Sequence, residues 1–264
     1  MLESLQRAPL LELNSVTVVR GDVPALRDVT LRIHAAENVC ILGPNGCGKS
    51  TLIKTITREC YPLARQDSSI SIMGKERWNV SELRSHLGIV SQDLLAACTS
   101  DAKGLDVVLS SFFSSTHIFP HHHPSGEQLA RAYAALEHIG IRHLADRPVS
   151  QMSSGESKRT LIARALVHNP QTLLFDEPAS ALDIAAQFQL RNVMRQLAQS
   201  GLGIILVTHH VSEIIPEIDR VILLKDGRIL ADGAKDRVLT SELLSSLFAV
   251  PVQLFRSDGY FHIH

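Results

Sequence analysis

The chain has 264 residues, of which 45% are hydrophobic and 20% charged, a balance typical of a globular protein with a substantial core. Lys and Arg number 26 against 27 Asp and Glu, so the composition argues against a protein that binds nucleic acid through bulk positive charge. No apolar run approaches the ~20 residues of a membrane span, and no basic segment precedes an apolar run at the N-terminus. We therefore expect a cytoplasmic protein with four reduced cysteines and no nucleic-acid partner.

The first zone of the chain, to about residue 61, predicts short strands followed by a glycine loop and a helix. Strands are expected at 11–13, 17–19 and 29–33, and the apolar run 39–42 is broken abruptly by Gly43-Pro44. After Ser50 the apolar residues recur at helical spacing. Strand, glycine loop and helix in this order are the arrangement of a loop that surrounds phosphate.

This loop fits the pattern G-x-x-x-x-G-K-S at every fixed position, in the run Gly43, Pro44, Asn45, Gly46, Cys47, Gly48, Lys49, Ser50 and Thr51. The pattern predicts backbone N–H groups pointing at phosphate oxygens, with Lys49 at the β- and γ-phosphates and Ser50 at Mg²⁺. Cys47 next to Lys49 could be a reactive thiol, but a small residue that simply fits the loop is the favoured interpretation.

The rest of the chain predicts a helical segment followed by alternating strands and helices. Residues 93–150 lack strand-like alternation, and Ser125 with Gln128 has the spacing of a capping box at the start of a helix over 125–139. Strands are expected at 172–175, 203–207 and 221–224, with a helix over 184–200. Strands separated by helices indicate a mainly parallel sheet that is covered on both faces.

Two adjacent carboxylates, Asp176 and Glu177, follow the apolar strand at 172–175. We expect Asp176 to hold Mg²⁺ through its water shell and Glu177 to accept a proton from an attacking water. The alternative, a solvated strand end, is disfavoured by the phosphate loop earlier in the chain.

With these motifs and four more, the sequence resembles the ABC (ATP-binding cassette) ATPases from about residue 11 to 250. The further motifs are Gln92 in the Q-loop, Met152-Ser153-Ser154-Gly155-Glu156 as the signature, Ser180-Ala181-Leu182-Asp183 as the D-loop, and the switch histidine His209. The resemblance implies that Gln92 contacts Mg²⁺, that His209 rather than the neighbouring His210 contacts the γ-phosphate, and that Lys49 takes part in catalysis. It also implies that Ser153 and Gly155 close on the ATP of a second subunit, whereas Ser153 alone would be an ordinary helix cap.

The implied fold is an α/β P-loop NTPase with a RecA-like, mainly parallel core sheet flanked by helices, an antiparallel β subdomain and an inserted α-helical subdomain. A single ABC ATPase domain is expected over 10–264. Its ATP-binding core and β subdomain are expected at 10–92 and 160–250, and its helical signature subdomain at 93–159.

The chain departs from the family pattern at two places. The signature has Ser154 for a glycine and Glu156 for a glutamine. We expect the signature to function, because Ser153 and Gly155 remain; the resemblance implies a carboxylate near the γ-phosphate of the partner's ATP, and whether it weakens closure stays open. Where a Tyr-Gly pair usually supports adenine, Arg20-Gly21 stands instead. The Arg20 guanidinium can stack on a base, although an exposed surface arginine explains it equally well.

The resemblance implies an ATP-hydrolysing subunit, peripheral on the cytoplasmic face of the membrane, that docks as a homodimer or as one of two paired ATPases on transmembrane permease subunits. Segments at 106–109, 136–141, 144–148, 238–244 and 248–252 resemble ATPases of metal-chelate importers, while Ser154-Gly155-Glu156 and Thr208-His209-His210 also fit molybdate-associated ATPases. Both cargo classes stay open, and the alternative is a soluble ABC ATPase with a non-transport role. The histidines at 121–123 suggest metal sensing, but no ligand frame accompanies them and a solvated loop is favoured.

Overall fold

The computed structural model describes residues 9–79, 82–83, 86–98 and 101–264, and in it the chain divides into two units. One unit holds the described residues up to Leu83 together with Gly203–His264, and the other holds those from His86 to Leu202. The predicted division into an ATP-binding core (10–92 and 160–250) and a helical subdomain (93–159) has bounds taken from sequence motifs, whereas the two units are defined by contacts within the folded chain. The predicted division therefore stays a prediction.

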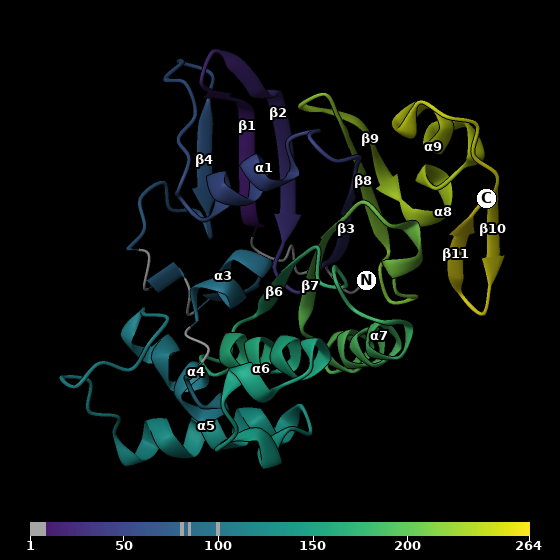
Figure 1. Ribbon diagram of the computed structural model, residues 1–264. Helices are drawn as coiled ribbons and strands as arrows, with labels where there is room; N and C mark the ends of the chain where they lie inside the picture. Colours follow the sequence, from purple (N-terminus) through teal and green to yellow (C-terminus); the bar gives the residue numbers. More distant parts are fainter. Residues whose placement is uncertain (1–8, 80–81, 84–85, 99–100) are drawn as a thin grey trace, which may run out of the picture. The chain divides into compact units, whose positions relative to one another are not determined.

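The first unit contains an antiparallel sheet in the order β2-β1-β4, formed by β1 (Pro9–Arg20), β2 (Val23–His34) and β4 (Ser69–Ile72) (Figure 1). The prediction of separate strands at 11–13 and 17–19 is wrong, because both belong to β1. Register shifts between Leu13 and Val16 act as bulges, so the long strand bends and stays paired with β2 along its length.

The second sheet of this unit has the order β7-β3-β8-β9. Its parallel strands β3 (Asn38–Leu42), β7 (Gly203–Thr208) and β8 (Arg220–Lys225) are almost wholly buried, and all three lie where the sequence predicts strands. The edge strand β9 (Arg228–Ala234) runs antiparallel to β8 and was not predicted. None of its side chains is fully buried, so it lacks the apolar run by which the other three are recognised.

Short elements complete the first unit. Helix α1 (Lys49–Ile56) buries Leu52, Ile53 and Ile56, as its helical spacing predicts. The remaining elements are η4 (Val211–Glu213), α8 (Lys235–Val238), α9 (Ser241–Phe248) and the hairpin of β10 (Leu254–Ser257) with β11 (Tyr260–Ile263).

The second unit is mainly helical around the parallel pair of β5 (Leu87–Val90) and β6 (Thr172–Asp176), and it contains the segment 93–150 for which the sequence predicts helices rather than strands. Its helices are α3 (Gln92–Ala97), α4 (Gly104–Ser110), η1 (Ser111–Phe113), α5 (Gly126–His138), η2 (Arg142–Leu144), η3 (Val149–Gln151), α6 (Ser154–Leu166) and α7 (Ile184–Gln199). The predicted capping box begins α5, with reciprocal hydrogen bonds between Ser125 and Gln128 of 2.9 and 3.2 Å. Within the described ranges no helix is long and apolar enough to cross a membrane.

The histidine-rich segment between η1 and α5 is a loop, as the sequence predicts. Its side chains pack on one another: the His122 ring stacks on Phe113 with centroids 4.2 Å apart, and His121 stacks on Phe119 at 5.7 Å. Over the part of the chain that the structure describes, no three His, Cys, Asp or Glu side chains form a group that could hold a metal ion.

Candidate nucleotide site

The phosphate loop lies between β3 and α1 in the first unit, as the sequence predicts. The loop runs from the buried end of β3 at Leu42 to the start of α1 at Lys49. The first turn of α1 carries no acidic side chain, so nothing there neutralises the partial positive charge of its N-terminal N–H groups. A strand that ends at such a helix start is suited to binding an anion.

Both fixed glycines of the loop are required by close contacts. A Cβ on Gly48 would lie 2.6 Å from the Ala25 carbonyl oxygen of β2, and its φ of +112° disfavours any L side chain. A Cβ on Gly43 would collide with the Leu224 carbonyl oxygen of β8. The loop is thus packed against two neighbouring strands through its backbone, which holds its curvature.

The Lys49 side chain lies inside the curve of the loop. Only 5% exposed, it donates hydrogen bonds from Nζ to the carbonyl oxygens of Gly43 at 2.9 Å and Pro44 at 3.0 Å. The loop therefore holds a cation among backbone dipoles, a setting that suits a polyphosphate. Asn45, Gly46 and Ser50 are exposed, so the backbone there and the Ser50 hydroxyl are accessible.

Cys47 is buried within the loop. Burial raises the pKa of its thiol, and this outweighs the opposing effect of the Lys49 cation. The thiol is held in its protonated, unreactive form, which agrees with the favoured interpretation of Cys47 as a small residue that fits the loop.

His209 follows the end of β7, the strand that pairs with β3 next to the phosphate loop. Strands β3 and β7 pair in parallel with Leu42 opposite Thr208, and the Gly43 N–H donates to the Thr208 carbonyl oxygen at 3.2 Å. Gly43, the first residue of the loop, directly follows Leu42 on β3, and His209 directly follows Thr208 on β7. The Thr208 hydroxyl accepts from the His210 N–H at 3.0 Å, and the two imidazole rings lie 3.9 Å apart. The contact between Thr208 and Gly43 was not predicted, because it spans 165 residues and leaves no local signal in the sequence.

Arg20 ends β1 in the same unit, exposed and paired with Val23 across the hairpin. The hairpin leads into Ala25, whose carbonyl oxygen closely approaches Gly48. Arg20 is thus five residues from a backbone contact with the phosphate loop.

Gln92, Asp176 and Glu177 belong to the second unit. Strands β5 and β6 pair in parallel with Val90 opposite Phe175, so Gln92 and the acidic pair follow the same edge of this pair of strands. Gln92 opens α3, whose cap is the Ser91 hydroxyl. Glu177 has a φ of +44°, a left-handed conformation that is uncommon for a glutamate and that turns the chain sharply after the strand.

The signature forms the start of α6, also in the second unit. The Ser153 hydroxyl accepts from the Glu156 N–H at 3.2 Å, and the Glu156 carboxylate accepts from the Ser153 N–H at 2.8 Å. A capping box of this kind satisfies both N–H groups, and it lowers the pKa of Glu156, with a smaller contribution from Arg147 at 3.2 Å. Ser153 is therefore a helix cap, and its hydroxyl proton is still available to donate to a phosphate oxygen.

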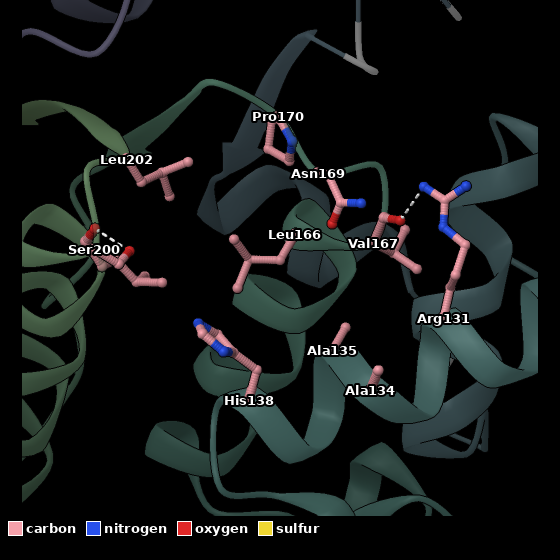
Figure 2. Close-up of a pocket in the computed structure, with 11 residues that line it drawn as sticks. Arg131, Ala134, Ala135, His138, Leu166, Val167, Asn169, Pro170, Ser200 and Leu202 are labelled. Atoms are coloured by element: carbon pink, nitrogen blue, oxygen red, sulfur yellow. Dashed lines mark hydrogen bonds between the residues drawn. The ribbon is translucent and has the colours of Figure 1, made fainter.

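A cavity of about 420 Å³ in the second unit does not include any of these motif residues. It lies where the C-terminal ends of α5, α6 and α7 meet, and Figure 2 shows His138, Leu166 and Leu202 around it. Arg131 at its side donates to the Val167 carbonyl oxygen at 2.7 Å. Leu166 ends α6 and Ser153 caps its start, so the helix length separates the cavity from the signature by ~20 Å.

Comparison with known proteins decides the family. A family model described as "ABC transporter" matches residues 26–180, more than half of the chain. The chain belongs to the ABC transporter family. It is 30% identical to the uncharacterized ABC transporter ATP-binding protein YlmA of Bacillus subtilis, over 93% of each chain. It is 32% identical to the hemin import ATP-binding protein HmuV of Hahella chejuensis, over 89% of this chain and 91% of that one.

Solved structures agree. A metal-chelate type ABC transporter in an inward-facing conformation matches with a TM-score of 0.78 at 26% identity, over 97% of this chain and 96% of that one. cbiO1 of Clostridium perfringens, part of the ABC transporter complex cbiONQ, matches with a TM-score of 0.75 at 28% identity, over 91% and 94%. A dimeric ATP-binding cassette in a post-hydrolysis state, bound to ADP and phosphate, matches with 0.69 at 26% identity, over 85% and 98%.

These findings confirm the predicted family and the predicted P-loop fold with its mixed core sheet, antiparallel sheet and helices. The chain is an ATP-binding ATPase subunit of an ABC transporter. Cassettes of this family form dimers and pair with membrane permease components.

Proposed function

We propose that two copies of the chain, on the cytoplasmic face of a membrane, hydrolyse Mg²⁺-ATP to drive import of a metal chelate or an oxyanion through partner permease subunits. The observation that carries the nucleotide part is the phosphate loop itself. Its two fixed glycines are backed by neighbouring strands, and Lys49 lies inside its curve. Thr208, which directly precedes His209, accepts from the N–H of the loop's first residue, Gly43.

The residues of the loop fit a triphosphate with its metal. Loop N–H groups and the start of α1 bind the phosphate oxygens, Lys49 offsets the charge on the β- and γ-phosphates, and Arg20 supports the base. We propose Ser50, Gln92 and Asp176 as the groups that hold Mg²⁺. Bound there, the metal would neutralise charge that develops on the transferred phosphoryl group.

Glu177 is the proposed general base. It follows Asp176 at the end of β6, and its left-handed backbone is the kind of strained conformation that concentrates at functional sites. There it accepts a proton from the attacking water, while His209 contacts the γ-phosphate. Ser153 and Gly155, at the start of α6, would close on the ATP of the second copy, with the helix start attracting its phosphate. The helical segment 93–159 would then transmit closure to the permease.

Substitution of Glu177 by Gln tests the chemistry. We expect the rate of hydrolysis to fall at least ~100-fold, because the amide cannot take up the proton from the attacking water. ATP binding should be retained, and a stable dimer should accumulate in the presence of ATP. Lys49→Ala should instead lose ATP binding. The matched control is Glu137→Gln, an exposed glutamate on α5, which should hydrolyse ATP as the unaltered chain does. Unchanged hydrolysis in Glu177→Gln would overturn the assignment.

The cargo proposal is supported by two relatives, the hemin import protein HmuV and the metal-chelate type transporter. Relatives with spermidine/putrescine or glutamate cargo occur at similar identity, so uptake must be measured directly. Cells lacking the chain should lose uptake of labelled hemin, ferric siderophore or molybdate, and the intact chain but not Glu177→Gln should restore it. Normal uptake of all three would refute the cargo proposal without touching the ATPase assignment.

A further inference from the structure

Strands β10 and β11 form a hairpin on the first unit (Figure 1). Its two-residue turn, Asp258-Gly259, has positive φ at both positions, +51° and +82°, as in a type I′ turn. At the open end, Gln253 and His264 exchange two backbone hydrogen bonds of 3.0 Å. The hairpin is therefore a defined element with a fixed register.

The hairpin packs on the segment that follows the switch histidine. Strand β11 contacts η4, and a Cβ on Gly259 would lie 3.2 Å from the Pro216 Cγ. Among residues 254–257 and 260–263, which make up the two strands, only Phe261 is buried, with 5% of its surface exposed. The Phe261 ring is therefore the main apolar contact of the hairpin with the rest of the unit.

The short helix η4 is joined directly to the candidate site. It begins at Val211, two residues after His209, and its cap is His210, whose carbonyl oxygen accepts from the Glu213 N–H at 3.2 Å. On the other side, the His210 N–H donates to the hydroxyl of Thr208 at the end of β7. His209 thus lies between a buried strand and a single helical turn, so its position depends on both.

The hairpin is anchored to α9, so it can act as a fixed support for η4. The Val252 N–H donates to the Ser245 hydroxyl at 2.9 Å, and the Leu254 N–H donates to the Ser241 hydroxyl at 3.1 Å. A close-packed aromatic ring restricts its neighbours to one arrangement, because a protein interior leaves little space for a second one. The contact of Phe261 therefore limits where η4 can lie.

We propose that Phe261 is a positioning residue for His209: its ring holds η4 in place, and η4 holds the histidine toward the γ-phosphate. The inference rests on the proposed function, in which His209 contacts that phosphate. Phe261 is buried on the hairpin and has no polar group to offer a nucleotide, so it acts only through η4. Its removal should lower the turnover rate and leave ATP binding to the phosphate loop nearly intact, because a misplaced catalytic group loses rate rather than ground-state affinity.

The test measures kcat and KM for Mg²⁺-ATP in the full chain with Phe261→Ala or Phe261→Leu, each with and without His209→Ala. Leucine keeps a large apolar side chain at the contact, whereas alanine leaves a cavity. The matched control is Phe255→Ala, because Phe255 is 53% exposed and lies on the other face of the same hairpin, opposite His262. Thermal melting checks folding, and Phe261→Val, which removes less of the side chain, replaces Phe261→Ala if that variant does not fold.

We expect Phe261→Ala to lower kcat about tenfold or more with KM changed less than about twofold, and Phe261→Leu to retain most of the rate. Phe255→Ala should match the unaltered chain. In the His209→Ala chain, Phe261→Ala should lower kcat no further, because the histidine that the ring positions is already absent. An unchanged kcat in Phe261→Ala, or an equal further loss in the His209→Ala chain, would overturn the proposal. Normal hydrolysis by His209→Ala alone would overturn the proposed role of His209 and this inference with it, which is a different result from a normal rate in Phe261→Ala alone.

Discussion

Replacing Gly48 with alanine is expected to disrupt the phosphate loop through two effects that the structure separates. The backbone φ of +112° lies outside the conformations that alanine adopts readily, which costs about 1–3 kcal/mol. In addition, the new Cβ would lie 2.6 Å from the Ala25 carbonyl oxygen and 3.1 Å from Leu26 Cδ2. The nearer atom belongs to the backbone of a paired strand, so relief requires the loop or β2 to shift, which adds about 1–3 kcal/mol.

The matched control is Gly46→Ala in the same loop. Gly46 also has a positive φ, +78°, but no atom lies within 4 Å of its Cβ position. Gly46→Ala should therefore lower the free energy of unfolding only by the backbone strain, about 1–2 kcal/mol. At ~2–4 °C per kcal/mol for a chain of this size, the total of about 2–6 kcal/mol should make Gly48→Ala melt about 4–24 °C below the unaltered chain, and Gly46→Ala about 2–8 °C below it.

Thermal melting of the three proteins, followed by titration with a fluorescent ATP analogue, measures both effects. We expect Gly48→Ala to lose at least ~100-fold in ATP affinity, because the shifted loop no longer aims its N–H groups at the phosphates. If Gly48→Ala melts and binds ATP as Gly46→Ala does, the close approach of Ala25 does not fix the loop and the reasoning fails.

Four further outcomes are expected. If Arg20 supports the base, Arg20→Tyr should tighten ATP binding by about 1 kcal/mol, since an aromatic ring stacks on adenine better than a flexible guanidinium. Equal ATP affinities for Arg20→Tyr, Arg20→Ala and the unaltered chain would show that Arg20 is a surface arginine. Glu156→Gln should keep the cap on Ser153 and raise ATP-dependent dimer formation by removing a charge near the partner's phosphate, with Glu156→Ala, which loses the cap, as control. Folding lowers the pKa of Glu156, so its charged cap stabilises the folded chain fully above the ordinary pKa near 4.5, and this stabilisation is lost as the pH falls through the lower folded-state pKa. The melting temperature of Glu156→Gln should lack this fall at acid pH. Alkylation at neutral pH, followed by mass spectrometry of peptides, should modify the half-exposed Cys60 well before the buried Cys47, whose raised pKa keeps it protonated; faster labelling of Cys47 would contradict this.

The family and its nucleotide chemistry were predictable from the sequence because the motifs are local. The phosphate loop Gly43 to Thr51, the acidic pair and the signature are each contiguous runs, and the order of such runs along the chain distinguishes the family. Helix α5 was predictable for the same reason, since both residues of its capping box lie three positions apart. The start of α7 has a similar signal in Asp183 before an apolar run, although its role as a cap was not predicted.

Contacts between distant residues decided the rest. The sequence does not show that the Thr208 carbonyl oxygen accepts from the Gly43 N–H, or that the Ala25 carbonyl oxygen requires a glycine at position 48. Nor does it show that burial raises the pKa of the Cys47 thiol despite the neighbouring lysine. The edge strand β9 escaped prediction because an edge strand without buried side chains has no apolar pattern. Only the folded chain reveals that Ile184 and Phe188 are exposed, because their apolar character alone predicts burial and the packing of α7 through its other face decides otherwise.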